Sequence, residues 1–243
     1  MFSNCFRVFS LQEEIIMTYF YFIIGTILAS FATLCAVRIP QHRSITVPRS
    51  HCDNCQHQLA WWQLIPIIGF VSQRGRCHYC HARINPISTL NECLCGWWFL
   101  QCAAFPAGPM LGYDCIFLTL ILLSTLDAYY TFVYPLCFLG LLPLFWLLPH
   151  PAYMTLSYWL GLIILTSILF MLFACQQLGL ADVEIMIILL MIFDLYTVSV
   201  ILFISSSLAL SYALITHQKE RFAFLPFLCF ALVAVLTVHL HFV

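Results

Sequence analysis

The sequence predicts an all-α, polytopic membrane protein with about eight transmembrane helices and one small cytosolic zinc-binding loop. Two observations support this fold class: 63% of the 243 residues are hydrophobic, and only 8% are Asp, Glu, Lys or Arg. Soluble domains carry about a quarter charged residues, so membrane lipids must solvate most of this chain. The net charge of −1 provides no basic field, which argues against nucleic acid as a partner.

Apolar runs recur along the chain at the length that a bilayer requires, which is about 20 residues for a helix. Some of these runs are short or interrupted, so a bundle with one span fewer is the alternative. The expected spans are residues 18–37, 92–110, 114–131, 136–149, 155–177, 183–195, 196–216 and 222–242.

The chain divides into four predicted regions. Residues 1–17 form an N-terminal extension, and Met17, directly before the first apolar run, is an alternative translation start. Residues 18–37 form the first transmembrane helix, 38–91 a polar loop, and 92–243 the remaining transmembrane core. The first run has no secretory cleavage site, so it is expected to be retained as a span.

The distribution of positive charge predicts the orientation. Six of the nine Lys and Arg residues lie in the loop 38–91, which the positive-inside rule places in the cytosol. With eight spans, Lys219 and Arg221 fall on the same side and both termini lie outside. The six loop arginines are Arg38, Arg43, Arg49, Arg74, Arg76 and Arg83.

The polar loop contains two CxxC pairs, Cys52-x-x-Cys55 and Cys77-x-x-Cys80. Two such pairs can close a tetrahedral four-thiolate site around Zn²⁺, and a reducing cytosol keeps the thiols free for it. Four cysteine ligands leave no open position, so the zinc is expected to be structural. A dithiol redox pair is the alternative. Nearby histidines could replace a thiolate but are interpreted as solvated: His51, His57, His78 and His81.

Acidic residues in or beside the spans are functional candidates, because they are costly in a bilayer. Asp114, interpreted as beginning a span, and Asp194, in a break between spans, are expected to be interfacial. Asp127 falls near the cytosolic end of its span. Asp182 falls in the first turn of its helix, where the macrodipole favours a carboxylate. The topology places Asp127 and Asp182 at one depth on one face.

Two neighbouring carboxylates do not readily ionise together, so one can hold a proton while the other activates water. Asp127 and Asp182 would then catalyse aspartyl peptide hydrolysis. Proton relays and cation sites also use two membrane acids, so a non-enzymatic transporter or scaffold is the alternative function.

Several short motifs occur in order over nearly the whole chain from about residue 20. They are ASFATLCAVRIP (29–40), PRSHCDNC, RGRCHYC, Asp127 followed by Tyr134-Pro135, GLADVEI around Asp182, and FAFLPFL (222–228). The ordered set resembles the type IV prepilin peptidases, the GxGD-type aspartyl proteases of membranes. Ala181 stands where the family has its second glycine, which restricts close packing at Asp182. Glu184 replaces the following lysine, a drift similar to the competence-associated branch of Gram-positive bacteria.

The resemblance implies a protease of the bacterial plasma membrane whose catalytic face is cytosolic. It would remove the short basic leader from type IV prepilin or pseudopilin precursors, with Asp127 and Asp182 as the catalytic pair. Many members of this family also methylate the new N-terminus with S-adenosylmethionine as the methyl donor. Glu92 and the loop are candidates for that step, although Glu92 as a favourable first-turn helix acid is the preferred interpretation.

Overall fold

The computed structural model describes residues 2–47, 49–103, 105–130, 156–175, 179–216 and 223–242. Within these ranges the chain is built of helices, and its β pairing is limited to two isolated bridges. The all-α prediction is therefore confirmed. The chain forms two compact units, Met1–Pro106 and Ala107–Val243.

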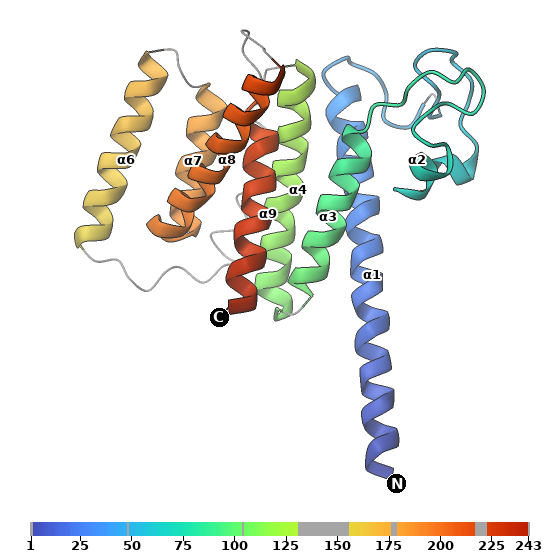
Figure 1. The fold of residues 1–243 in the computed structure, drawn as a ribbon, viewed down its shortest axis with the longest axis horizontal. Helices are drawn as coiled ribbons and strands as arrows, with labels where there is room; N and C mark the ends of the chain where they lie inside the picture. Colours follow the sequence, from blue (N-terminus) through green and yellow to red (C-terminus); the bar gives the residue numbers. More distant parts are fainter. Residues whose placement is uncertain are drawn as a thin grey trace. The chain divides into compact units, whose positions relative to one another are not determined.

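The first unit contains two long helices and a loop (Figure 1). The long helices are α1 (Phe2–Arg38) and α3 (Ile87–Cys102), which pack against each other. Between them lie the 3₁₀ helix η1 (Trp61–Leu64) and the short helix α2 (Ile68–Ser72). The helix α1 extends from Arg38 through Met17 back to Phe2.

Close packing of α1 and α3 depends on two glycines. A Cβ on Gly25 would lie 2.8 Å from the carbonyl oxygen of Cys95, and one on Gly96 would lie 2.8 Å from the Thr26 side chain. Small residues at such crossings let helix backbones approach closely. A buried hydrogen bond of 3.1 Å from the Asn91 amide to Thr33 Oγ1 fixes the register of the two helices.

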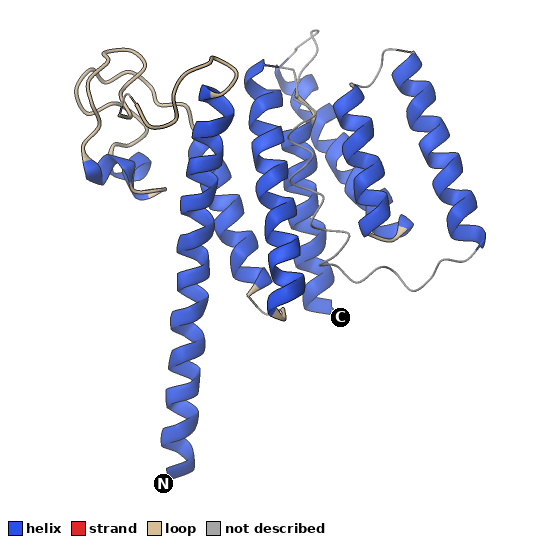
Figure 2. Ribbon diagram, turned by 180° about the vertical axis from the view of Figure 1, so that it is seen from behind, coloured by secondary structure: helices blue, strands red, loops and turns tan. Residues whose placement is uncertain are grey.

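The second unit is a helical bundle of α4 (Ala107–Tyr130), α6 (Leu156–Ala174), α7 (Leu180–Ile192), α8 (Leu195–Thr216) and α9 (Leu225–Phe242). Helix α9 packs against both α4 and α8, and α7 packs against α6 and α8 (Figure 2). Buried side chains of α4 and α9, each at most 1% exposed, form its core: Phe117, Leu120, Ile121, Leu228 and Leu232.

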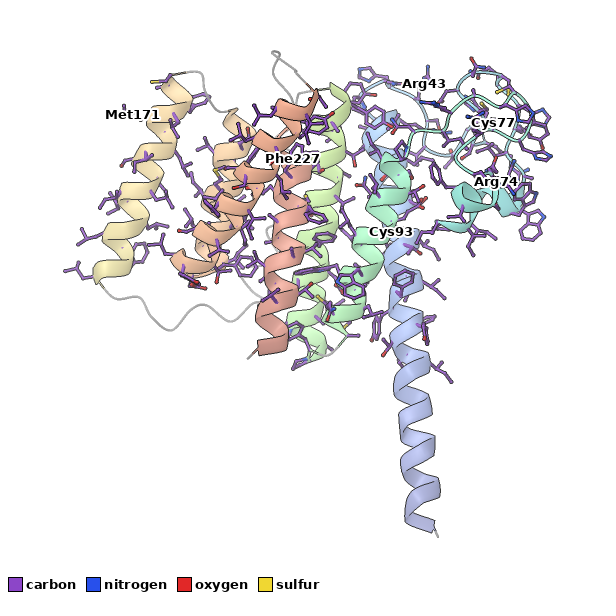
Figure 3. All side chains as sticks on the ribbon, viewed as in Figure 1. Arg43, Arg74, Cys77, Cys93, Met171 and Phe227 are labelled. Carbon is purple, nitrogen blue, oxygen red and sulfur yellow. The ribbon has the colours of Figure 1, made fainter. Side chains whose placement is uncertain are left out.

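Three helices of the described residues are long and apolar enough to cross a membrane, at Ile16–Arg38, Ala107–Tyr130 and Leu195–Thr216. Trp159–Ala174 and Leu225–Val238 are shorter apolar helices. Large apolar side chains on α6, including Met171 at 67% exposed, face outward as lipid-facing residues do (Figure 3). The expected span 136–149 lies outside the described residues, and the total of eight remains a prediction.

The position expected for Asp114 is wrong. Helix α4 begins at Ala107, so Asp114 lies two turns inside the helix and is 5% exposed instead of marking its interfacial start. The expected break at 111–113 is wrong for the same reason, because α3 ends at Cys102 and α4 continues from Ala107 through these residues. Pro109 lies in the first turn of α4, where its missing N–H removes no helical hydrogen bond.

Candidate functional site

The structure brings the four cysteines of the CxxC pairs together. The Sγ atoms of Cys52, Cys55, Cys77 and Cys80 all lie within 4.8 Å of one another, and those of Cys52 and Cys80 are 3.8 Å apart. Tetrahedral Zn–S bonds of about 2.3 Å place sulfur atoms about 3.8 Å apart. The cluster therefore fits a closed four-thiolate zinc site. Cys77 is buried within the loop, whereas Cys93 is exposed on α3 (Figure 3).

The two CxxC pairs have the same local fold. The N–H of Gln56 donates to the Cys52 carbonyl at 2.9 Å, and the N–H of His81 donates to the Cys77 carbonyl at 3.0 Å. Both donors have φ 58°, a left-handed conformation that turns the chain back after each pair. This repeated turn directs both thiols of each pair toward a common centre.

Hydrogen bonds around the cluster favour the thiolate form at one position. The backbone N–H of Ala82 and the Asn54 side chain, whose amide lies 3.6 Å from the sulfur, lower the pKa of Cys80 to about 6. The thiolate is the form of cysteine that binds metal. In the same cluster the pKa of Cys55 is raised to about 11, so the four thiols share the negative charge unequally.

The neighbouring histidines have other contacts. The His57 and Tyr79 rings lie 3.6 Å apart between centroids, and His78 meets the edges of Trp62 and Tyr79. His51 Nδ1 is 3.0 Å from the carbonyl oxygen of Arg49. These placements agree with their interpretation as loop residues.

The interpretation of Glu92 as a first-turn acid is wrong. Helix α3 begins at Ile87, so Glu92 lies in its second turn and is 5% exposed. Its carboxylate accepts hydrogen bonds from the backbone N–H of Ile67 at 2.8 Å and from Ser88 Oγ at 3.1 Å. Glu92 therefore ties the loop to α3.

In the second unit, Asp127 lies three residues before the end of α4 and is partly buried. Its Oδ2 accepts a hydrogen bond of 3.3 Å from the backbone N–H of Leu225, the first residue of α9. The first N–H groups of a helix have no partner within the helix and carry its positive dipole end. The start of α9 therefore positions and stabilises the Asp127 carboxylate.

Asp182 lies in the first turn of α7, as expected from the sequence. Its Oδ2 accepts a hydrogen bond of 3.3 Å from the backbone N–H of Gly179, the N-cap residue. Gly179 has an ordinary φ of −75°, but a Cβ there would lie 3.2 Å from Asp182 Oδ2. The glycine thus leaves room for the carboxylate. The sequence predicts that Ala181 restricts close packing at Asp182, but the side chain of Ala181 lies outside the described residues.

The bundle places Asp127 and Asp182 where the charge of one carboxyl group acts on the other. Next to Asp182 in sequence, Val183 and Met186 of α7 form a buried cluster with Leu169 of α6, and Phe224, which precedes α9, packs against this cluster. The end of α4 and the starts of α7 and α9 lie at one end of the bundle (Figure 1).

The role of the α9 start was missed by sequence reasoning. The motif FAFLPFL was identified, but its Leu225 was assigned no task. Pro226 is the residue that could have indicated this role, because proline is common at helix starts, where the first N–H groups have no partner within the helix.

Asp194 caps α8: its carboxylate accepts hydrogen bonds from the Thr197 N–H at 3.1 Å and the Thr197 hydroxyl at 2.5 Å.

Comparison with known proteins relates the first unit to a peptidase family. Residues 23–105 match the model of the bacterial peptidase A24 N-terminal domain. This range includes the cysteine cluster and ends one residue before the unit boundary at Pro106. Asp127 and Asp182 lie beyond the matched residues. No solved structure matches the chain.

Curated relatives named prepilin leader peptidase/N-methyltransferase match parts of the chain. The protein from Myxococcus xanthus is 37% identical over 83 residues, covering 34% of this chain and 25% of the relative. The Bacillus subtilis protein is 47% identical over 64 residues, 26% of each chain. The Klebsiella pneumoniae protein is 28% identical over 128 residues, 49% of this chain and 56% of the relative.

The matches thus span between a quarter and somewhat over half the length of these relatives. Within those limits, residues 23–105 are similar to a bacterial peptidase A24 N-terminal domain, and the chain is related to proteins named prepilin leader peptidase/N-methyltransferase.

Proposed function

We propose that the protein is a membrane aspartyl endopeptidase that removes the short basic leader from type IV prepilin-like precursors. The observation that carries the proposal is that the charge of Asp127 acts on Asp182, with each carboxyl group accepting a backbone hydrogen bond beside the N-terminal end of a helix. The relatives' names supply the substrate class, since they are called prepilin leader peptidases.

The proposed chemistry requires one proton shared by the two acids. One carboxylate, acting as general base, takes a proton from a water molecule that attacks the scissile carbonyl carbon. The other, protonated, carboxyl group donates its proton to the carbonyl oxygen. The tetrahedral gem-diol collapses as its C–N bond breaks: the first carboxyl group gives the proton that it took from water to the departing amine, and the second carboxylate recovers a proton from a gem-diol hydroxyl as the new carboxyl group forms. No acyl-enzyme forms, because the nucleophile is water.

The location of the acids suits a substrate cut at the membrane surface. Asp127 is near the last turn of the apolar helix α4, and Asp182 is in the first turn of the apolar helix α7. A precursor whose hydrophobic helix lies in the bilayer would present the peptide bond at the end of that helix to this depth. The six arginines of loop 38–91 support a cytosolic location for this face in a bacterial plasma membrane.

In this proposal zinc would be held by Cys52, Cys55, Cys77 and Cys80 and would be structural. With four thiolates bound, zinc has no free position for water or substrate. Its contribution would be to the folding of the loop, which has little apolar core of its own.

A second activity, N-methylation of the new N-terminus with S-adenosylmethionine as the donor, is proposed from the relatives' names. Glu92 already holds the Ile67 N–H and the Ser88 hydroxyl, which gives this acid a structural task of its own.

The test uses the full chain reconstituted in lipid vesicles with a precursor that carries a basic leader before a hydrophobic helix. Mass spectrometry of the product should show loss of the leader, and addition of S-adenosylmethionine should add one methyl group. Asp182→Asn should abolish leader removal and leave the precursor intact. The matched change Asp194→Asn, at the cap of α8, should still allow the leader to be removed. An intact precursor with folded, zinc-loaded wild-type protein would contradict the peptidase proposal.

A further inference from the structure

The loop of the first unit exposes a set of large apolar side chains. Trp61 and Leu64 of η1 and Ile68 and Val71 of α2 are 78%, 46%, 60% and 63% exposed. Residues between them face inward instead: Gln63 is 7% exposed and Gly69 is buried. The segment 61–71 therefore has a buried side and an apolar outer side.

The buried side of this segment is rigidly built. The Gln63 side chain accepts the Ala60 N–H at 2.8 Å and donates to Gln73 Oε1 at 3.1 Å. Gln73 in turn donates to the Gly69 carbonyl at 2.8 Å. Gly69 is so close to Gln63 that a Cβ there would lie 2.2 Å from its carbonyl oxygen. The outer side chains are thus displayed on a fixed scaffold.

Two hydrogen bonds set the depth of the segment along the membrane helices. The Ile67 N–H is held by Glu92 of α3, and the adjacent Asn91 bonds to Thr33 of α1. Thr33 precedes the end of α1 at Arg38 by five residues, or about 7.5 Å of helix rise. Amphipathic segments at a membrane surface bury their apolar side about 5–10 Å into the headgroup region.

Positive charge directly after segment 61–71 favours a lipid partner. Exposed Arg74 and Arg76 follow α2 directly, and Figure 3 shows Arg74 beside that helix. Loop 38–91 contains six arginines and only one acidic residue, Asp53, so its net charge is positive. Arginines next to apolar side chains pair with anionic headgroups, whereas this surface would repel the basic leader of a precursor.

We propose that Trp61, Leu64, Ile68 and Val71 insert into the headgroup–acyl boundary of an anionic bilayer, with Arg74 and Arg76 at its phosphates. This membrane-interface anchor holds the cysteine loop against the leaflet at which α1 ends. The inference rests on α1 as a span and is independent of the chemistry proposed for Asp127 and Asp182.

The test measures the fluorescence of Trp61 in the full chain, reconstituted in nanodiscs that contain anionic phospholipid. Subtracting the spectrum of Trp61→Phe from that of the wild type isolates this residue among the six tryptophans. Lipids brominated near the headgroup end of the acyl chain should quench most of the Trp61 signal, and aqueous iodide should quench little. The partly buried Trp62, isolated through Trp62→Phe, should be quenched less by the same lipids.

Two further variants sharpen the test. Ile68→Gln with Val71→Gln should reduce the lipid quenching of Trp61, whereas Val47→Gln, 69% exposed elsewhere in the loop, should not. Asp182→Asn should leave the quenching unchanged, which separates this inference from the peptidase proposal. Quenching of Trp61 by iodide would place it in water and overturn the anchor. Protection from both quenchers would mean that a protein covers the segment, which would overturn the anchor equally.

Discussion

The backbone N–H of Leu225 donates a hydrogen bond to the Asp127 carboxylate across 98 residues of sequence. Asp182 is held in a similar way, by the N–H of its own N-cap Gly179. Both acids of the candidate site are therefore positioned by backbone donors at helix starts. Such donors are fixed by the fold and favour a negative charge, so they can hold a carboxylate in place without a basic side chain.

The space at Gly179 predicts a variant that affects activity more than stability. In Gly179→Ala the new methyl group would press on Asp182 Oδ2 and displace it by a few tenths of an ångström. Small misplacements of reacting groups are costly, and we expect roughly a tenfold loss of kcat/KM for leader removal. Thermal unfolding should show only a small loss of stability, about 1 kcal/mol or less, because φ of −75° suits alanine although alanine is a poor N-cap residue.

The matched control for this variant is Gly108→Ala. A Cβ on Gly108, at the start of α4, would have no neighbour within 4 Å. Its kcat/KM should equal that of the wild type. Equal losses in both variants would show that the effect does not depend on contact with Asp182.

Zinc content provides a prediction for the cysteine cluster. Wild-type protein should carry about one zinc ion per chain, since the four thiolates form one closed site. Cys77→Ser removes a buried ligand and should abolish most of the zinc, measured by elemental analysis of purified protein. Cys93→Ser, an exposed cysteine on α3 outside the cluster, should retain it. A wild-type protein without zinc after purification free of chelators would argue against the structural site.

Asp194 is expected to stabilise the fold without acting in catalysis. Asp194→Ala removes the cap of α8 and should lower the free energy of unfolding by about 1 kcal/mol, with leader removal retained. Asp194→Asn keeps a side-chain acceptor and should cost less. Chemical denaturation of the two variants measures the difference, and loss of peptidase activity in both would be the contrary result.

The same cap should depend on pH. Partial burial alone would raise the pKa of Asp194, but the Thr197 hydroxyl and N–H hold this pKa below its ordinary value. A lowered folded-state pKa means that the stabilisation is present above the ordinary aspartate range and is lost as the pH falls through the folded-state pKa. The stability difference between wild type and Asp194→Asn should therefore shrink on strong acidification.

Glu92 should govern the attachment of the loop to α3. Glu92→Ala leaves the partly buried N–H of Ile67 without its acceptor, which costs about 1 kcal/mol. Glu92→Gln retains an acceptor oxygen and should retain most of the attachment. Hydrogen exchange of residues 61–72 should rise strongly in the alanine variant and weakly in the glutamine variant. Equal exchange in wild type and Glu92→Ala would contradict this structural role.

The helices were predictable because lipid-exposed and buried positions alike are apolar, so continuous runs indicate spans. The expected spans 155–177, 196–216 and 222–242 correspond closely to α6, α8 and α9. Helix starts were less predictable. Polar residues ahead of Glu92 resembled loop, yet α3 begins at Ile87 directly after Pro86, and Asn91 and Glu92 are satisfied by partners on other segments.

The side chains of the candidate site could be proposed from the sequence, but the backbone groups around them could not. Cysteine spacing alone indicates a shared centre, and the topology placed Asp127 and Asp182 at one depth. The backbone donor of Leu225 was not predictable, because any residue supplies an N–H and no side-chain identity marks its use. The outer side of segment 61–71 was also hidden in sequence, where apolar residues occupy both of its sides.

The most direct test of the central claim, that Asp127 and Asp182 act as one unit on one water, is a double-mutant cycle of leader removal. Asp127→Asn, Asp182→Asn and the double variant should all be inactive to the same degree, because groups that act together are non-additive when removed. Zinc content and thermal unfolding should match the wild type in all three. Substantial activity in either single variant, or a further large loss in the double variant, would contradict the shared site.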